Sequence, residues 1–289
     1  MSVSTLARGM LVTDLDGTLK PSAGGFRPVD IEALQRLMSE GVITAIATGR
    51  SLFSYTRDIT HPLPVDYIIF SSGAGILRTS DWKILRAVQL EPEQAEAAIS
   101  LLLDYHLDFM VQQPIPEEHR FFFHATGNPN PDFERRLASY RDHAEPMGSM
   151  KENALAATQL VAIIPETEGV FVYERLKRNL SGLTVIRTTS PLDHSSTWVE
   201  IFPANASKSQ AAQWLAHGRE LSPQDVLCVG NDFNDLDMLE WAGTSYVVAN
   251  SPGELRERFP EVASNNDGGV AEAIRLWLSQ REGSANLPP

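Results

Sequence analysis

The amino-acid sequence predicts an α/β fold in which a doubly wound, parallel-sheet domain carries a second, inserted α+β domain. Short apolar runs alternate with segments of helical spacing at both ends of the chain, which is typical of parallel sheets with right-handed crossovers. The middle of the chain mixes hairpins and helices, as α+β domains do. We therefore expect one domain formed by residues 1–76 and 199–289 and another formed by residues 77–198.

The N-terminal part predicts three buried strands and two helices. The strands are apolar runs without polar alternation, which indicates burial on both faces of a sheet. Gly41 ends the first helix, and Ser51 is a suitable N-cap for the second. The expected strands cover residues 10–12, 42–47 and 67–70, and the expected helices cover residues 28–40 and 51–58.

The remaining elements follow from the same patterns. In the middle we expect a hairpin over 75–90, helices over 92–106, 132–142 and 169–180, and strands over 107–111, 120–124, 159–164, 183–187 and 197–202. The strand–helix alternation then resumes, with helices over 207–217, 234–241, 253–258 and 269–280 and strands over 226–229 and 246–248.

Composition and charge exclude several classes of protein. A length of 289 residues suits about two domains. The net charge of −13 argues against nucleic acid or an anionic membrane as a partner, because both require a basic surface. No apolar run approaches the roughly 18 residues of a membrane span, and the N-terminus lacks the apolar core of a secretory signal. We expect a cytoplasmic protein, a monomer or a homodimer, whose lone cysteine, Cys228, forms no intrachain disulfide.

Four polar loops adjoin the expected strands and helices of the first domain. In a parallel sheet the carboxyl ends of the strands share one edge, where ligands bind. Asp14 and Asp16 are two residues apart, so their side chains are expected to point the same way. The four loops are Asp14-Leu15-Asp16-Gly17-Thr18, Thr48-Gly49-Arg50-Ser51, Asn205-Ala206-Ser207-Lys208 and Gly230-Asn231-Asp232-Phe233-Asn234-Asp235.

Each loop alone has an ordinary interpretation as a solvated turn, a helix cap or a surface lysine. Together they suit phosphoryl transfer, in which positioning and charge do most of the work. In this interpretation Asp14 attacks phosphorus, and Asp16 protonates the leaving alcohol and then deprotonates water. Thr48, Gly49 and Lys208 hold the phosphate oxygens.

The fourth loop also suggests a metal site. Its density of oxygen-bearing side chains near two further acids suits a hard cation such as Mg²⁺. Such a cation reduces the repulsion between a carboxylate nucleophile and a phosphate. The candidate ligands are Asp14, Asp16, Asn231, Asp232 and Asp235.

The combined motifs resemble the haloacid dehalogenase (HAD) superfamily, and within it the Cof-type phosphatases related to sucrose-phosphate and mannosyl-phosphoglycerate phosphatases. The resemblance implies a HAD-like Rossmannoid core with an inserted cap domain. It also implies a Mg²⁺-dependent phosphatase that hydrolyses a small phosphorylated metabolite, a sugar phosphate, through an aspartyl-phosphate. Asn231 departs from the family pattern, which has an aspartate that binds Mg²⁺ at this position, so either Asn231 or Asp232 is the expected ligand.

Substrate contacts are expected from Arg50 and from His194, which lies in a polar loop of the inserted block. Two alternatives stay open. A phosphomutase or phosphotransferase of the same superfamily would return the phosphoryl group to an acceptor other than water. A catalytically impaired phosphate-binding protein is the second alternative, and Asn231 is the residue that supports it.

Overall fold

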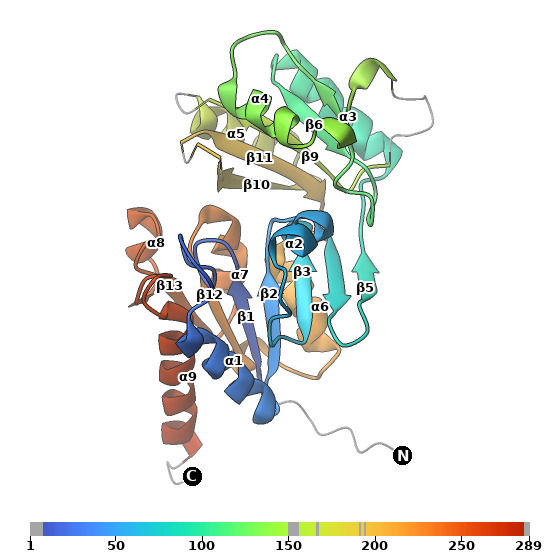
Figure 1. Ribbon diagram of the computed structural model, residues 1–289. Helices are drawn as coiled ribbons and strands as arrows, with labels where there is room; N and C mark the ends of the chain where they lie inside the picture. Colours follow the sequence, from blue (N-terminus) through green and yellow to red (C-terminus); the bar gives the residue numbers. More distant parts are fainter. Residues whose placement is uncertain (1–7, 150–155, 166–167, 191, 194, 286–289) are drawn as a thin grey trace. The chain divides into compact units, whose positions relative to one another are not determined.

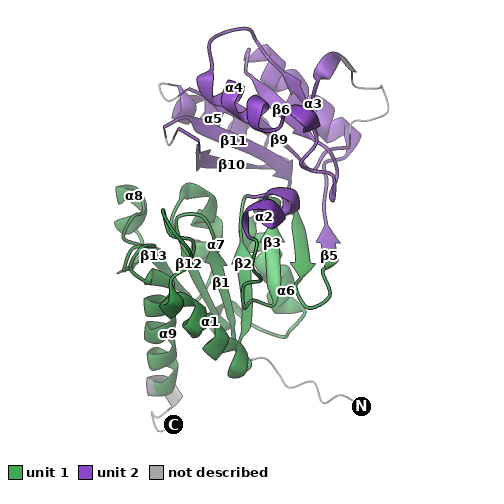
Figure 2. Ribbon diagram, in the orientation of Figure 1, with its two compact units in different colours: residues 1–49, 60–85, 208–289 green, residues 50–59, 86–207 purple. Residues whose placement is uncertain are grey.

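The computed structural model describes residues 8–149, 156–165, 168–190, 192–193 and 195–285. The chain divides into two compact units (Figure 2). Unit 1 comprises residues 1–49, 60–85 and 208–289, and unit 2 comprises residues 50–59 and 86–207. The main boundaries between the two units lie between residues 85 and 86 and between residues 207 and 208. The boundaries predicted from the sequence are 76/77 and 198/199.

Unit 1 is built on a mostly parallel sheet of eight strands in the order β14-β13-β12-β1-β2-β3-β4-β5. The pairs from β14 to β3 are parallel, and β4 runs antiparallel to β3. The strands are β1 Met10–Asp14, β2 Ile43–Ala47, β3 Tyr67–Phe70, β4 Gly75–Arg78, β5 Lys83–Ala87, β12 Val226–Gly230, β13 Thr244–Val248 and β14 Glu261–Val262. The predicted parallel-sheet α/β class is confirmed.

Helices cover both faces of this sheet, which makes unit 1 doubly wound (Figure 1). All five residues of β1 are buried, because both faces are covered. Met10 and Val12 pack with the apolar residues of α6 and α7, whereas α1 packs with α9. The helices are α1 Pro28–Ser39, α6 Lys208–His217, α7 Leu236–Trp241, α8 Gly253–Arg256 and α9 Gly269–Ala285.

Unit 2 contains a mixed sheet in the order β10-β11-β9-β6-β7-β8. Residues of α3 and α5 share one apolar cluster with this sheet, and Phe133 of α4 belongs to a second cluster. The strands are β6 Phe109–Gln112, β7 Phe121–His124, β8 Ala144–Pro146, β9 Gln159–Ile164, β10 Leu183–Thr189 and β11 Thr197–Pro203, and the helices are α2 Leu52–Asp58, α3 Pro92–Asp104, α4 Pro131–Ser139 and α5 Gly169–Asn179.

Two short strands were not predicted from the sequence. β8 has three residues and β14 has two, and neither is long enough to show an alternating or apolar pattern. Helix α4 ends at Ser139 and a 3₁₀ turn over Arg141–His143 follows, so the expected helix over 132–142 is shortened. Within the part of the chain that the structure describes, no helix has the length and apolarity needed to cross a membrane.

Candidate active site

The register of unit 1 brings three of the polar loops to one edge of the sheet. β1 lies between β12 and β2, and its residues pair in parallel with both neighbours. Asp14 pairs with Ala47, immediately before Thr48, and Thr13 pairs with Val229, immediately before Gly230. The loops that leave these three strands therefore begin side by side.

Lys208 links two of these loops from the first position of α6. Its side chain is fully buried. The Nζ atom lies 2.7 Å from Asp14 Oδ1 and 2.6 Å from Asp235 Oδ1. Burial lowers the pKa of this ammonium group, but the carboxylates of Asp14 and Asp235 outweigh burial and raise it. Lys208 is therefore a fixed positive charge between two acids.

Asp235 holds the loop after β12 in its shape. Its Oδ2 accepts hydrogen bonds from the backbone N–H groups of Asn231 at 2.8 Å and Asp232 at 3.1 Å. A Cβ on Gly230 would lie 2.7 Å from the Cβ of Asp235, so the loop requires glycine at this position. Both oxygens of Asp235 are thus engaged, one with Lys208 and one with the backbone.

Asp14 is the other buried acid of the cluster. Burial raises the pKa of its carboxyl to about 7, with Asp235 adding to the rise and Lys208 opposing it. Its Oδ1 accepts a hydrogen bond from Lys208. Its Oδ2 lies 3.0 Å from one terminal atom of the Asn231 amide. The two oxygens of Asp14 therefore face different groups, a cation on one side and an amide on the other.

The same terminal atom of Asn231 lies 3.1 Å from the backbone oxygen of Asp16 and 3.0 Å from Thr18 Oγ1. Asn231 comes this close to the loop after β1 because residue 17 is glycine. Gly17 has a φ of +82°, and a Cβ there would lie 2.6 Å from the other terminal atom of the amide. The three oxygens around Asn231 come from Asp14, Asp16 and Thr18.

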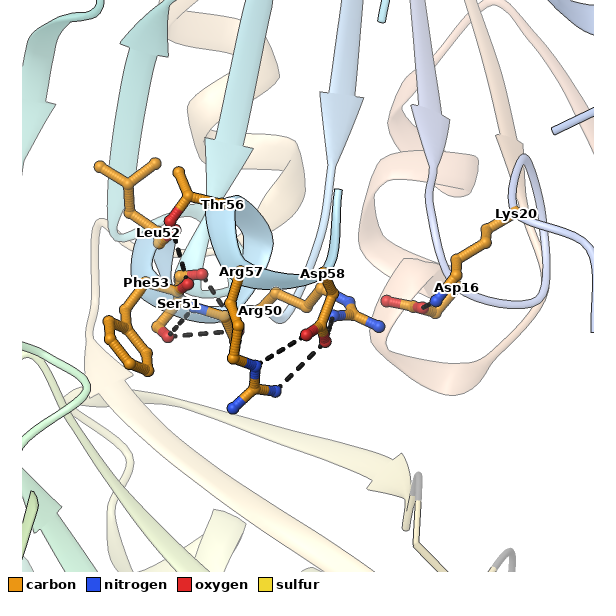
Figure 3. A network of polar contacts seen from close by, with 10 residues as sticks. Asp16, Lys20, Arg50, Ser51, Leu52, Phe53, Thr56, Arg57 and Asp58 are labelled. Atoms are coloured by element: carbon orange, nitrogen blue, oxygen red, sulfur yellow. Dashed lines mark hydrogen bonds and ion pairs between the residues drawn. The ribbon is translucent and has the colours of Figure 1, made fainter. Parts of the chain in front are cut away.

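Asp16 differs from Asp14 in its surroundings. The side chain of Asp16 is 43 % exposed and lies 3.8 Å from Lys20 Nζ (Figure 3). The side chain of Asp14 is 7 % exposed. The two acids are therefore not equivalent, since Asp14 contributes a buried carboxylate and Asp16 contributes its backbone oxygen to the Asn231 side.

Thr48 lies at the same sheet edge and is buried. Its backbone N–H donates to Ile69 at 2.8 Å, and its carbonyl accepts from the Ser72 N–H at 3.0 Å. These bonds tie the start of the second loop to the end of β3. Gly49, the next residue, is the last residue of unit 1 in this segment.

Asp232 and Arg50 each make a different contact in the structure. The Oδ1 of Asp232 accepts the backbone N–H of Phe233 at 2.8 Å, as the N-cap of a 3₁₀ turn. Arg50 belongs to unit 2, where it forms an ion pair with Asp58 beside Arg57 at the C-terminal end of α2 (Figure 3). His194 lies outside the described residues.

Two asparagines that the sequence interpretation missed support the loop after β1. Asn250 donates through Nδ2 to the Gly17 oxygen at 2.8 Å and accepts the Asn265 N–H at 2.9 Å. Asn265 donates to the Lys20 oxygen at 3.1 Å. Asn250 follows the apolar strand β13 closely, and the other polar loops likewise follow apolar strands.

The described residues include no group of three or more His, Cys, Asp or Glu side chains arranged to hold a metal ion. This finding agrees with the presence of an amide, not a carboxylate, at residue 231. The oxygens close to the Asn231 amide that could help to hold a cation are Asp14 Oδ2 and the backbone oxygen of Asp16.

Comparison with known proteins identifies the family. The family model for haloacid dehalogenase-like hydrolases matches residues 11–274. The chain belongs to this family. The predicted resemblance, including the Cof-type subgroup, is confirmed, and so is the predicted enzyme class, a phosphoric monoester hydrolase.

Several proteins named as phosphatases match nearly the whole chain. The 5-amino-6-(5-phospho-D-ribitylamino)uracil phosphatase YwtE of Bacillus subtilis is 24% identical over 286 residues, covering 93% of this chain and 98% of that protein. The HMP-PP phosphatase of Yersinia enterocolitica is 23% identical over 274 residues, covering 92% and 94%.

Solved structures show the same fold. The HAD phosphatase BT1666 of Bacteroides thetaiotaomicron has a TM-score of 0.74 at 19% identity, covering 96% of this chain and 97% of that one. The HAD subclass IIB sugar phosphatase BT4131 has a TM-score of 0.70 at 17% identity, covering 93% and 98%.

Proposed function

We propose that this HAD hydrolase is a Mg²⁺-dependent phosphatase that cleaves a sugar phosphate through an aspartyl-phosphate on Asp14. The observation that carries the proposal is the buried Asp14 carboxylate, held between Lys208 on Oδ1 and the Asn231 amide on Oδ2. A nucleophile that is fixed in this way loses little freedom when it attacks, which is how an enzyme lowers the entropic part of the barrier.

In the first step a carboxylate oxygen of Asp14 forms a bond to phosphorus while the bond from phosphorus to the sugar oxygen breaks. Asp16 donates a proton to that leaving oxygen. In the second step Asp16 takes a proton from water, the water oxygen attacks phosphorus, and the bond to Asp14 breaks. The exposed side chain of Asp16 can be reached by the leaving oxygen in the first step and by water in the second.

Phosphate oxygens are bound by positive charge and by donors at the sheet edge. Lys208 offers an ammonium group to the same region as the Asp14 carboxylate. The Thr48 hydroxyl and the Gly49 N–H follow β2, next to β1 in the sheet. These groups stabilise the negative charge of the transferring phosphoryl group, as phosphoryl transfer requires.

The residues present fit a magnesium ion. Magnesium binds oxygen at about 2.0–2.1 Å in octahedral geometry, so adjacent ligands lie about 3.0 Å apart. The outer amide atom of Asn231 lies 3.0 Å from Asp14 Oδ2 and 3.1 Å from the Asp16 oxygen. With Asn231 Oδ1 at this position, Asn231, Asp14 and the backbone of Asp16 would hold the ion. The ion would offset the repulsion between the carboxylate and the phosphate.

The relatives support a sugar-phosphate substrate class. YwtE is named for a phosphoribityl substrate, and BT4131 is described as a sugar phosphatase. Both names describe a phosphate on a polyhydroxylated chain or ring. Arg50 and His194 are the residues that we propose to contact such a substrate.

The test is phosphate release by the purified protein from a panel of sugar, polyol and nucleotide phosphates with Mg²⁺. We expect sugar and polyol phosphates to be the best substrates. Asp14→Asn should reduce the rate at least about 1,000-fold because it removes the nucleophile, and its circular dichroism spectrum should match that of the parent. Turnover retained by Asp14→Asn would exclude the aspartyl-phosphate, and no release from any panel member would overturn the proposal.

The phosphomutase alternative is separated by labelled water. A phosphatase incorporates one oxygen of the labelled water into each phosphate that it releases. A mutase returns the phosphoryl group to an organic acceptor, so phosphorylated isomers accumulate without labelled phosphate.

A further inference from the structure

Asn231 is placed where its two amide orientations have opposite consequences. With the nitrogen as its outer atom, the amide donates to Asp14 Oδ2 at 3.0 Å and to the Asp16 oxygen at 3.1 Å. With the oxygen as its outer atom, it accepts one hydrogen bond from Thr18 Oγ1 at 3.0 Å and faces two further acceptors. The surrounding hydrogen bonds decide which orientation is stable.

Without a cation the nitrogen orientation is favoured. When the Asp14 carboxyl is ionised, its Oδ2 and the carbonyl oxygen of Asp16 are acceptors only, and an amide NH₂ has two hydrogens to donate. In the reverse orientation the outer oxygen of Asn231 lies about 3 Å from three other oxygens. Of these, Thr18 Oγ1 alone has a proton to donate. Oxygens that approach one another without a hydrogen between them repel, so the amide turns its nitrogen toward the two acceptors.

With a divalent cation the preference reverses. An NH₂ group cannot bind a cation, whereas the amide oxygen is a good ligand for Mg²⁺ or Ca²⁺. The spacing of 3.0 and 3.1 Å then becomes the distance between adjacent ligands of one ion. The Asn231 amide, Asp14 Oδ2 and the Asp16 oxygen therefore form a hydrogen-bonded cluster without the cation and a set of oxygen ligands with it. Rotation of the Asn231 amide by 180° converts one arrangement into the other.

We propose that Asn231 is a cation-dependent amide switch, with nitrogen facing Asp14 and Asp16 in the metal-free protein and oxygen facing the cation when it is bound. This inference rests on the proposed cation of the active site. A carboxylate at residue 231 has no donor with which to satisfy the metal-free site. Asn231 supplies the hydrogen bonds of the metal-free site with its own amide nitrogen. It also binds the cation more weakly than an aspartate would, because its amide oxygen carries no charge.

The charges nearby explain why an acid at residue 231 would be costly without metal. The cluster already contains two buried carboxylates, Asp14 and Asp235, and one buried ammonium group, Lys208. Asn231→Asp adds a third negative charge at about 3 Å from Asp14 Oδ2 and removes two hydrogen bonds. The metal-free variant should be destabilised, and the cation should bind it more tightly.

The experiment is thermal unfolding of the full chain with EDTA and with saturating Mg²⁺. In EDTA we expect the midpoint of Asn231→Asp to lie about 5 °C or more below that of the parent chain. Mg²⁺ should raise the midpoint of the variant by more than it raises that of the parent. Calorimetric titration with Mg²⁺ alone should show binding about tenfold tighter to the variant, because affinity rises with ligand charge.

Asn234→Asp is the matched control, because it makes the same substitution in the same loop. A midpoint in EDTA that falls for Asn231→Asp and not for Asn234→Asp supports the switch. An equal fall in both variants, or a midpoint for Asn231→Asp at or above that of the parent, overturns it.

A second measurement needs no variant. Hydrogen exchange of the Asn231 side-chain NH₂ can be followed by NMR in protein labelled at asparagine. The exchange should be slow in EDTA and at least about tenfold faster with Mg²⁺, because the nitrogen then no longer donates to Asp14. Equal exchange in both conditions contradicts the switch. Neither readout uses turnover, so failure of the phosphatase proposal appears separately, as absent phosphate release with these shifts intact.

Discussion

Two buried carboxylates, one in each unit, are held in different ways. Asp235 in unit 1 and Glu118 in unit 2 both have no exposed surface. Asp235 has Lys208 at 2.6 Å and two backbone N–H donors. Glu118 accepts the Leu52 N–H at 2.7 Å through Oε1, while its Oε2 accepts no hydrogen bond from the described residues.

The comparison shows what a buried charge requires. Taking an ion out of water is costly, and only a close counter-charge with further hydrogen bonds compensates it. The cluster around Lys208 meets this condition and keeps charged groups available for chemistry. Burial raises the pKa of Glu118, and the backbone N–H groups of Leu52 and of Glu118 itself do not compensate for it. Glu118 is therefore a structural acid that anchors α2.

The largest effect should come from Lys208→Met. The variant leaves Asp14 and Asp235 buried without their cation, so we expect about 3–5 kcal/mol of the unfolding free energy to be lost. Urea denaturation at neutral pH measures it. Lys20→Met is the control, since Lys20 is partly exposed and 3.8 Å from Asp16, and it should change stability by at most about 0.5 kcal/mol.

A double variant sharpens this test. Lys208→Met should cost less when Asp235→Asn is already present, because one of the two carboxylates is then neutral. Equal costs in both backgrounds would show that Lys208 acts through packing and not through charge.

Glu118→Gln should remove a pH dependence of stability. The native pKa of Glu118 is raised above its unfolded value, so the folded state holds a proton that the unfolded state releases. The parent chain therefore loses stability as pH rises through the native pKa and gains it as pH falls toward about 4.5, the unfolded value.

The measurement is the difference in unfolding free energy between the parent and Glu118→Gln from pH 8 to pH 4.5. The parent should gain relative to the variant as pH falls, by about 1.4 kcal/mol for each unit of pKa difference. A difference in unfolding free energy that does not change across this range would mean that Glu118 has the same pKa in the folded and unfolded states.

The smallest effect should come from Asp58→Asn at the end of α2. Arg57 and Arg50 lower the pKa of Asp58 to about 2, with the Arg57 hydrogen bond as the largest cause and partial burial opposing it. Solvent reaches this pair, so its loss should cost less than about 1 kcal/mol at pH 7. The cost should be full above about pH 4 and should vanish as pH falls toward 2. A cost above about 2 kcal/mol would mean that the ion pairs of Asp58 stabilise the fold as strongly as a buried pair does.

Much of the candidate site follows from local patterns. The apolar runs that become β1, β2 and β12 are continuous, and the polar residues come directly after them. Parallel pairing then brings Asp14, Thr48 and the loop after Gly230 to one edge, as the sequence predicts.

Other features depend on contacts between residues that are far apart in sequence. Helix α2 belongs to unit 2 because Phe53 stacks on His119 with ring centroids 4.3 Å apart and because Glu118 accepts the Leu52 N–H. The exposure of Asp16 and the position of the Asn231 amide likewise depend on how separate loops meet. No periodicity in the sequence encodes such contacts, so a pattern cannot predict them.

The order of strands in unit 1 has a consequence for synthesis on the ribosome. β1 is synthesised long before its partner β12, which is residues 226–230. Until that segment emerges, one edge of the nascent sheet presents unpaired N–H and C=O groups, a surface that invites pairing with other chains. A truncated chain that stops before β12 should therefore be retained by chaperones or aggregate, while the full-length chain closes the gap itself.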